Sequence, residues 1–242
     1  MSQDHLSDLR FDALEIDDRV QAGIRDAGFE LCTPIQASTL PIALKSHDVA
    51  GQAQTGTGKT AAFLIATYQR LLQGEPSSDG QKQPRAFMLA PTRELAVQIA
   101  NDAEVLGKHT GLVVGLAFGG TDYDKQRNHI QAGIDILIGT PGRIIDYFKQ
   151  GVFKLDQVEV AVLDEADRMF DLGFIKDIRY LLRRLPDPDK RLNMLFSATL
   201  SQRVMELAYE HMNEPELVRI EPDKVTERCR WQLAEVVVDA GG

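Results

Sequence analysis

The stretch Ala53–Thr60, AQTGTGKT, decides the fold, because it nearly matches the phosphate-binding loop pattern GxxxxGK[ST]. Gly56 and Gly58 let the backbone approach a phosphate group. Lys59 can reach the terminal phosphates, and the hydroxyl of Thr60 is a suitable ligand for Mg²⁺. The alternative is an ordinary glycine-rich turn. The candidate nucleotide-binding residues of this loop are Ala53, Gln54, Thr55, Gly56, Thr57, Gly58, Lys59 and Thr60.

The first position of the loop departs from the pattern, since it carries Ala53 where glycine is usual. A relaxed turn at this position needs no positive φ, so alanine is compatible with the loop. Lys59 is expected to face solvent and to take no part in the core.

Short apolar runs and helix-like segments alternate outward from this loop. The apolar runs begin at Asp48, Arg85, Leu112, Asp135, Val158, Leu192 and Leu217, and the clearest helical stretches begin at Ala61, Glu94 and Phe174. Such runs are typical of strands buried on both faces, and the helical stretches repeat apolar residues at three and four. The alternation predicts an α/β fold with a doubly wound, mostly parallel sheet and helices on both faces.

Polar motifs follow the apolar runs directly: AQTGTGKT, PTREL, GG, TPGR, DEAD and SAT. The carboxyl ends of parallel strands share one edge of a sheet, and ligands bind at that edge. We therefore expect the six motifs to form one functional surface.

The run VEVAVLDEAD ends a predicted strand with Asp164 and Glu165. In a P-loop ATPase one carboxylate at this place binds Mg²⁺ and a second orients the attacking water. Acidic residues also favour helix N-termini through the helix dipole, which is the alternative reading. Beside the loop at residues 53–60, the pair predicts that Asp164 and Thr60 bind Mg²⁺ and that Glu165 polarises water. Lys59, Asp164 and Glu165 are the candidate catalytic residues.

Composition limits the functional classes. The chain has 242 residues, 43% of them hydrophobic, with a formal net charge of −9 and two cysteines far apart in sequence. It contains neither a long apolar run nor a signal-like N-terminus, so we expect a cytoplasmic protein without a membrane segment. The cysteines and five histidines lack metal-ligand spacing. The negative charge argues against a diffuse basic surface for nucleic acid, so any such contact must be local.

Taken together, the motifs resemble those of the DEAD-box RNA helicase family. DEAD at residues 164–167, AQTGTGKT, PTRELA, GG, TPGR, SAT and the upstream GFELCTPIQ occur in the family's order, and the similarity runs from Phe11 to about Ile220. The segments DEADRMFDLGFIKDIR and RLNMLFSATLS further resemble one bacterial subgroup. The resemblance implies the amino-terminal, RecA-like domain of an ATP-dependent RNA helicase, with ATP and Mg²⁺ as its cofactors.

GFELCTPIQ, residues 28–36, resembles the family's adenine-reading Q motif. Phe29 offers a stacking face, Thr33 belongs to the motif, and the family pattern places Phe11 behind the base. The amide of Gln36 has one acceptor and one donor group, which match the N6 donor and N7 acceptor of adenine but not the two acceptors of guanine. The alternative is that Phe29 is a core residue and that Thr33 with Pro34 only begins a helix.

The resemblance also implies contacts to the sugar-phosphate backbone of one RNA strand, which would make binding sequence-tolerant. Ordinary helix capping, with Thr140 as N-cap and Pro141 at the first helical position, is the alternative for TPGR. SAT is implied to link the ATP state to RNA release through hydroxyl contacts with the DEAD loop, while Ser201 caps the following helix. The implied RNA-binding residues are Pro91, Thr92, Arg93, Gly119, Gly120, Thr140, Pro141, Gly142 and Arg143, and the coupling residues are Asp167, Ser197 and Thr199.

We expect residues 1–37 to form an N-terminal extension with the Q motif, 38–221 the RecA-like domain, and 222–242 a linker with the truncated start of a second domain. That second domain would supply the arginines that complete the ATP site, so the chain alone should be nearly inactive. It would also carry most contacts to RNA-degradation partners. Two rivals stay open: another P-loop NTPase, such as a DNA-directed helicase or a nucleotide kinase, and an ATP-responsive scaffold without turnover.

Overall fold

A computed structural model describes residues 6–74, 82–120 and 122–220. Its centre is a seven-stranded sheet in the order β3-β4-β2-β5-β6-β1-β7, and every neighbouring pair of strands is parallel. The strands are β1 (Val49–Gln52), β2 (Ala86–Leu89), β3 (Val114–Ala117), β4 (Ile136–Gly139), β5 (Val160–Leu163), β6 (Leu192–Ser197) and β7 (Glu216–Arg219). The predicted parallel α/β sheet is confirmed, and each of the seven predicted strands is present.

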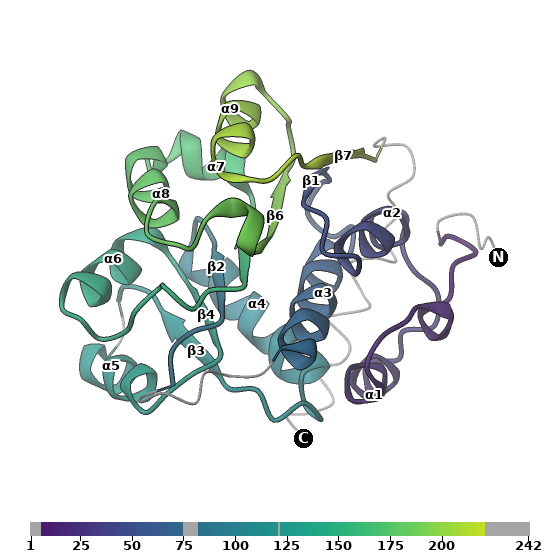
Figure 1. The fold of residues 1–242 in the computed structure, drawn as a ribbon, viewed down its shortest axis with the longest axis horizontal. Helices are drawn as coiled ribbons and strands as arrows, with labels where there is room; N and C mark the ends of the chain where they lie inside the picture. The colour runs from purple at the N-terminus through teal and green to yellow at the C-terminus, as the bar shows by residue number, and fades with distance from the viewer. Residues whose placement is uncertain (1–5, 75–81, 121, 221–242) are drawn as a thin grey trace.

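Helices cover both faces of the sheet (Figure 1). The elements are η1 (Phe11–Ala13), α1 (Asp18–Asp26), α2 (Pro34–Ala43), α3 (Lys59–Gln73), α4 (Arg93–Leu106), α5 (Tyr123–Gln131), α6 (Pro141–Lys149), α7 (Ala166–Asp171), α8 (Ile175–Leu182), η2 (Pro188–Lys190) and α9 (Gln202–His211). The helical stretches expected from Ala61, Glu94 and Phe174 correspond to α3, α4 and α8.

Two hydrophobic clusters form because successive strand residues point to opposite faces. Met88, Val162 and Met194 belong to the cluster that α1 to α4 cover. Phe87 and Leu163 belong to the cluster that includes α6 to α9. The helices α1 to α4 therefore pack on one face of the sheet and α6 to α9 on the other.

The prediction that all strands are buried on both faces is wrong for the two edge strands. β3 alternates between buried and half-buried residues, and in β7 only Val218 is buried. Each of these strands has a neighbour on one side only, so its side chains have fewer strand neighbours to bury them. The inner strands β2, β4, β5 and β6 are buried throughout.

A buried polar cluster fixes the amino end of the strand that leads into the Ala53–Thr60 loop. Asp48 accepts hydrogen bonds from the backbone N–H of Asn193 at 2.7 Å, from the Asn193 side-chain amide at 2.7 Å and from the backbone N–H of Asn213 at 2.6 Å. These contacts tie the start of β1 to the start of β6 and to the turn before β7. The loop therefore leaves the sheet from a fixed strand.

The N-terminal part of the chain packs on the same body. Residues such as Phe11, Val20, Ile24 and Ile35 are buried in the cluster shared with α3 and α4. The division at residue 37 stays a prediction, as does the linker at 222–242, which lies outside the described residues. The segment at residues 73–84, whose Gly, Pro and Ser residues predict a surface loop, lies partly outside them.

Candidate functional site

All six motifs follow carboxyl ends of strands at one edge of the sheet, as predicted. The strand order divides them: the loops after β5, β6 and β1 carry DEAD, SAT and AQTGTGKT, and the loops after β3, β4 and β2 carry GG, TPGR and PTREL. Backbone bonds join neighbouring loops, from Ala53 N–H to the Ser197 carbonyl and from Asp164 N–H to the Leu89 carbonyl, each at 3.0 Å. The edge therefore has two halves in direct contact. The first half carries AQTGTGKT, DEAD and SAT, and the second half carries PTREL, GG and TPGR.

The Ala53–Thr60 loop has the backbone that its glycines predict. Gly56 has a φ of 83° and Gly58 a φ of 88°, which only glycine adopts without strain. Ala53 has no positive φ, since in the described ranges the non-glycine residues with positive φ are Ser46, Glu165 and Glu214. The Thr57 hydroxyl donates to the Gln54 carbonyl at 2.9 Å and closes the turn.

Lys59 does not face solvent, and that prediction is wrong. Its Nζ lies 2.8 Å from Oδ1 of Asp164, and both side chains are almost fully buried, with 5% and 1% of their surface exposed. The lysine begins α3, and its stem extends across the edge of the sheet to the end of β5. The two candidate catalytic residues therefore form a buried ion pair.

The other oxygen of this carboxylate is unsatisfied. Oδ2 of Asp164 is buried and has no hydrogen-bond partner among the described residues, whereas Oδ1 also accepts from the backbone N–H of Glu165 at 2.9 Å. Burial raises the pKa of Asp164, and the charge of Lys59 opposes that shift. A buried carboxylate oxygen without a partner is costly, which is typical of a position that completes its coordination with a ligand.

Glu165 has a strained backbone and a fixed side chain. Its φ of 53° and ψ of 52° are left-handed, an unusual conformation for a residue with a side chain. One carboxylate oxygen accepts from the Thr55 hydroxyl at 3.1 Å, and the other pairs with Arg168 at 3.2 Å. The carboxylate is therefore held against the Ala53–Thr60 loop. Arg168 was not among the residues predicted from the sequence, although its i+3 spacing from Glu165 on a helix was a usable signal.

The donor set at this place suits Mg²⁺. Asp164 offers its unpartnered oxygen, and the nearby first turn of α3 offers the hydroxyl of Thr60. Within the described part of the chain no cluster of three or more His, Cys, Asp and Glu side chains could hold a metal. One carboxylate and a hydroxyl fit Mg²⁺, which usually keeps waters and takes further oxygens from a phosphate substrate.

Gln36 connects the segment at residues 28–36 to the Ala53–Thr60 loop. Its Oε1 accepts from the backbone N–H of Thr33 at 2.8 Å, and its Nε2 donates to the Gly58 carbonyl at 3.0 Å. One acceptor site and one N–H of the amide are left for a base. The hydroxyl of Thr33 is buried without a partner among the described residues. Thr33 is also the N-cap residue of α2, with Pro34 in its first turn, so the expected helix start is present.

The rings of Phe11 and Phe29 stack, with centroids 6.1 Å apart and planes at 27°. Both are buried, with 2% and 7% of their surface exposed. Phe29 is therefore a core residue in this structure. Its stacking on adenine, with Phe11 behind it, stays a prediction.

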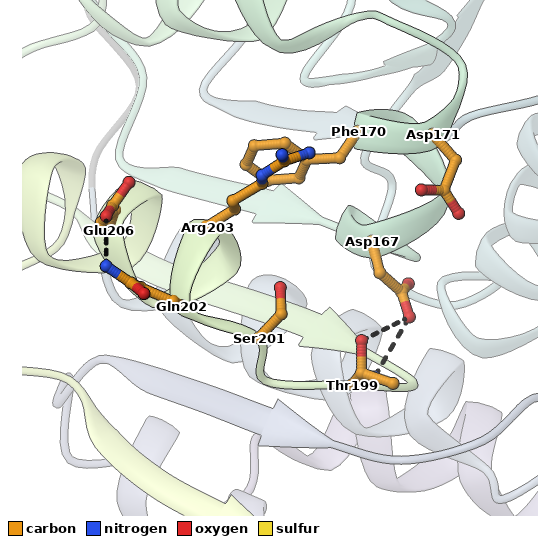
Figure 2. Close-up of a pocket in the computed structure, with 8 residues that line it drawn as sticks. All are labelled: Asp167, Phe170, Asp171, Thr199, Ser201, Gln202, Arg203 and Glu206. Carbon is orange, nitrogen blue, oxygen red and sulfur yellow. Dashed lines mark hydrogen bonds between the residues drawn. The ribbon is translucent and has the colours of Figure 1, made fainter.

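DEAD and SAT are in direct contact (Figure 2). The backbone N–H of Asp167 donates to the Ser197 hydroxyl at 3.1 Å. The backbone N–H and the hydroxyl of Thr199 donate to Oδ2 of Asp167 at 3.1 and 3.2 Å. Ser201 accepts from the Val204 N–H and caps α9, as predicted. The contacts expected of the three coupling residues are present, and a cleft of about 720 Å³ opens beside them between α7 and α9.

The second half of the edge presents two helix N-termini and two arginines. Thr92 caps α4 through a bond from the Leu95 N–H at 3.3 Å, and Pro91 before it is buried. Arg93 donates to the Gly120 carbonyl at 3.2 Å, which joins PTREL to GG.

TPGR begins the second of these helices. Thr140 is the N-cap residue of α6 and Pro141 is in its first turn, but the Thr140 side chain makes no capping bond to a described residue. The helix start of the capping alternative is therefore present, but the Thr140 hydroxyl does not cap the helix. Gly142 has open space where a Cβ would lie, and Arg143 is half-buried on α6.

No helix in the described ranges combines the length and apolar character needed to cross a bilayer. A sequence model described as DEAD/DEAH box helicase matches residues 33–207.

Curated relatives include the ATP-dependent RNA helicase RhlB of Histophilus somni (strain 129Pt), 62% identical over 234 residues, which are 96% of this chain and 56% of that protein. RhlB of Haemophilus influenzae is 62% identical over 226 residues, 93% of this chain and 54% of that protein. The chain thus spans about half the length of these relatives. The bacterial subgroup that the sequence resembled is the one these relatives represent.

Solved structures with the same fold include a DEAD box protein from the hyperthermophile Methanococcus jannaschii, with a TM-score of 0.78 and 28% identity over 96% of this chain and 70% of that one. A hypothetical ATP-dependent RNA helicase from Sulfolobus tokodaii has a TM-score of 0.75 and 31% identity over 85% of this chain and 57% of that one. The expected RecA-like helicase fold is confirmed.

Proposed function

The chain belongs to the DEAD/DEAH box helicase family, and we propose that it is the ATP-binding and RNA-contacting half of an ATP-dependent RNA helicase that separates short RNA duplexes. One observation carries the proposal: six motif loops lie along one sheet edge, with the Lys59–Asp164 pair in one half and two arginines in the other. The relatives' names, ATP-dependent RNA helicase, support the same activity.

In the nucleotide half, the loop amides and the N-terminus of α3 would bind the phosphates. Lys59 would leave Asp164 for the terminal phosphate, and Asp164 with Thr60 would hold Mg²⁺, which when bound neutralises phosphate charge. Glu165 would orient the attacking water and accept its proton. Its position beside Thr55 supports this role, because the carboxylate already lies against the loop.

In the adenine site, Gln36 would read the base edge with the acceptor and donor that its contacts to Thr33 and Gly58 leave over. Phe29 would stack on the base and Phe11 support it. ATP should therefore bind more tightly than GTP.

The other half would contact the sugar-phosphate backbone of one RNA strand. The contacts would come from the side chains of Thr92, Arg93, Thr140 and Arg143, from the backbone around Gly119 and Gly120, from the bend at Pro91 and from the start of α6 at Pro141 and Gly142. Helix N-termini and single arginines bind phosphates without a broad basic surface, which fits a formal net charge of −9. Asp167, Ser197 and Thr199 would link the two halves.

A second RecA-like domain, for which the longer relatives have room, would supply the arginines that complete the ATP site. Such an arginine raises the rate by about 10³–10⁵ in P-loop NTPases, so hydrolysis by this chain alone should be close to background. We further propose a cytoplasmic role in RNA turnover, with degradation partners bound mainly by that second domain.

The test is to measure Mg²⁺-dependent binding of a fluorescent adenine nucleotide, RNA binding, and ATP hydrolysis with and without RNA. We expect binding of both ligands by residues 1–242 with nearly no turnover, and RNA-stimulated turnover once the second domain follows on the same chain. Strong RNA-stimulated hydrolysis by residues 1–242 would refute the two-domain mechanism. Stimulation by DNA alone would favour a DNA-directed helicase, and binding without turnover in the longer chain would favour a scaffold.

A further inference from the structure

Both arginines in the second half of the sheet edge lie on aromatic rings that flank the same connection, between β3 and α5. Arg93 is the first residue of α4, which follows β2, and its guanidinium carbon lies 5.3 Å from the centroid of the Phe118 ring. Arg143 comes from α6, after β4, and its guanidinium carbon lies 4.8 Å from the centroid of the Tyr123 ring. Phe118 directly follows β3, and Tyr123 is the first residue of α5.

The Arg143 contact is part of a closed cluster. Its guanidinium carbon also lies 5.3 Å from the Tyr147 ring, and its Nη1 donates to the Tyr147 hydroxyl at 3.3 Å. That hydroxyl donates in turn to the Tyr123 carbonyl at 2.7 Å, and the two tyrosine rings are 4.9 Å apart. The guanidinium therefore contacts two rings, one from α5 and one from its own helix α6.

Arg93 is fixed in a comparable way, by a ring and by a carbonyl. Besides the Phe118 ring, the Gly120 carbonyl accepts from its Nη1 at 3.2 Å. Phe118 is itself held, because it is buried and its backbone N–H donates to Gln126 at 3.1 Å on α5. The ring under Arg93 is therefore part of the folded body.

We propose that Phe118 and Tyr123 are positioning residues for RNA binding, which set the places of the two phosphate-contacting arginines Arg93 and Arg143. The proposal rests on the proposed RNA-binding function of this edge. A free arginine loses rotamer entropy when it binds a phosphate, and a guanidinium already held on a ring loses less.

The test uses residues 1–242, a fluorescein-labelled single-stranded oligouridylate and anisotropy titrations at low salt. Replacing Tyr123 by Leu removes the ring but keeps an apolar side chain, and should weaken RNA binding about 3- to 10-fold, the range expected for a partly exposed cation–π contact. Tyr123→Phe keeps the ring and should bind within about 2-fold of the unmodified chain, and Phe118→Leu should act like Tyr123→Leu. Tyr180→Leu is the matched control. Tyr180 is on α8, away from the motif loops, and the guanidinium carbon of Arg184 lies 3.4 Å from the centroid of its ring.

A double-mutant cycle shows whether Tyr123 acts through Arg143. The chain with both Tyr123→Leu and Arg143→Gln should bind RNA no more weakly than Arg143→Gln alone. Additive losses of RNA affinity in the double variant would overturn the positioning role. The role would also be overturned if Arg143→Gln weakened RNA binding and Tyr123→Leu left it unchanged. If neither Arg143→Gln nor Arg93→Gln weakens binding, the RNA-binding function of this edge falls and the inference falls with it.

A spectroscopic readout separates positioning from general stability. In the unmodified chain the side-chain Nε–H signal of Arg143 should be displaced by the ring currents of Tyr123 and Tyr147 in a ¹H–¹⁵N spectrum. Tyr123→Leu should move this signal toward the position of a solvated arginine, and Tyr123→Phe should restore it. An Arg143 signal that is unchanged in Tyr123→Leu would contradict the proposal even if RNA binding were weaker.

Discussion

Replacing Gln36 by Ala separates two roles of this side chain, support of the phosphate loop and recognition of adenine. Gln36 is 3% exposed and makes two hydrogen bonds, from the Thr33 N–H at 2.8 Å and to the Gly58 carbonyl at 3.0 Å. Each such bond contributes about 0.5–1.5 kcal/mol, so their loss should lower the free energy of unfolding by ~1–3 kcal/mol and the melting temperature by about 2–12 °C.

Adenine recognition adds a second, ligand-specific loss. The acceptor site and the N–H that remain on the amide would each bind the base edge, so affinity for adenine nucleotides should fall by ~1–3 kcal/mol more than affinity for guanine nucleotides. The assays are thermal unfolding of the free chain and titration with fluorescent adenine and guanine nucleotides. Gln36→Glu is the matched variant, since it keeps the acceptor for Thr33 but loses the donor for Gly58.

A different result would refute each of the two roles of Gln36. Equal losses for adenine and guanine nucleotides, or equal affinities in the unmodified chain, would exclude adenine reading and leave the support of the loop intact. An unchanged melting temperature in Gln36→Ala would show that the bonds to Thr33 and Gly58 do not stabilise the free chain.

Three further predictions concern buried groups. Lys59→Ala should abolish measurable ATP affinity and destabilise the chain by about 3–5 kcal/mol, because it leaves the Asp164 carboxylate buried and unpaired. Adding Asp164→Asn to this variant should restore the melting temperature but not the ATP affinity. An unchanged melting temperature in Lys59→Ala alone would contradict the buried ion pair. Gly58→Ala should lower both stability and nucleotide affinity, because φ is 88° and a Cβ would lie 2.6 Å from Nε2 of Gln36, whereas Gly142→Ala, with open space for a Cβ, is the control for melting. Burial raises the pKa of Asp102 to about 7, above its ordinary value of 3.8, so the folded state binds the extra proton and stability should fall as pH rises from about 4 to 7 and then level off. Asp102→Asn should remove that dependence and stabilise the chain at pH 8 by at most ~4 kcal/mol. The measurement is the free energy of unfolding, obtained with denaturant at each pH, and the same pH dependence in both proteins would refute this prediction.

The strands and the motif positions could be predicted from sequence because they depend on local patterns. An apolar run such as VAVL in β5, ended by DEAD, marks both a buried strand and the side chains that leave it. Whether a strand lies at the edge depends on its neighbours, so the exposure of β7 could not be predicted from LVRI. The helix α5 was not recognised, because YDKQRNHIQ contributes only Ile130 to the core and shows little apolar periodicity.

Contacts across the fold were beyond the sequence patterns. Lys59 and Asp164 belong to loops after different strands, so the pattern named both residues without indicating that they pair in the absence of nucleotide. Tyr123 is an ordinary polar-helix residue in sequence, and only the adjacency of β3 and β4 brings it to Arg143. Side chains that orient a functional group from a neighbouring loop therefore need the sheet order before they can be found.

The position of β5 in the sheet brings the loop that follows it into contact with both halves of the edge. β5 lies between β2, which leads to PTREL, and β6, which leads to SAT, and Asp164 donates its backbone N–H to the Leu89 carbonyl at the end of β2. Glu165 contacts Thr55 of the Ala53–Thr60 loop, and Asp167 contacts Ser197 and Thr199.

These contacts lie within four consecutive residues, and the backbone between them is strained at Glu165, the N-cap residue of the short helix α7. A ligand that drew the Glu165 carboxylate away from Thr55 would act directly on the start of α7, which carries Asp167. The bond that Asp167 donates to Ser197 and the bonds that it accepts from Thr199 would then change with the nucleotide state. Thr199→Val, which removes the hydroxyl bond but keeps the backbone bond, should weaken the effect of ATP on RNA affinity more than it weakens the binding of either ligand alone. Equal coupling of ATP and RNA in the two chains would refute this route.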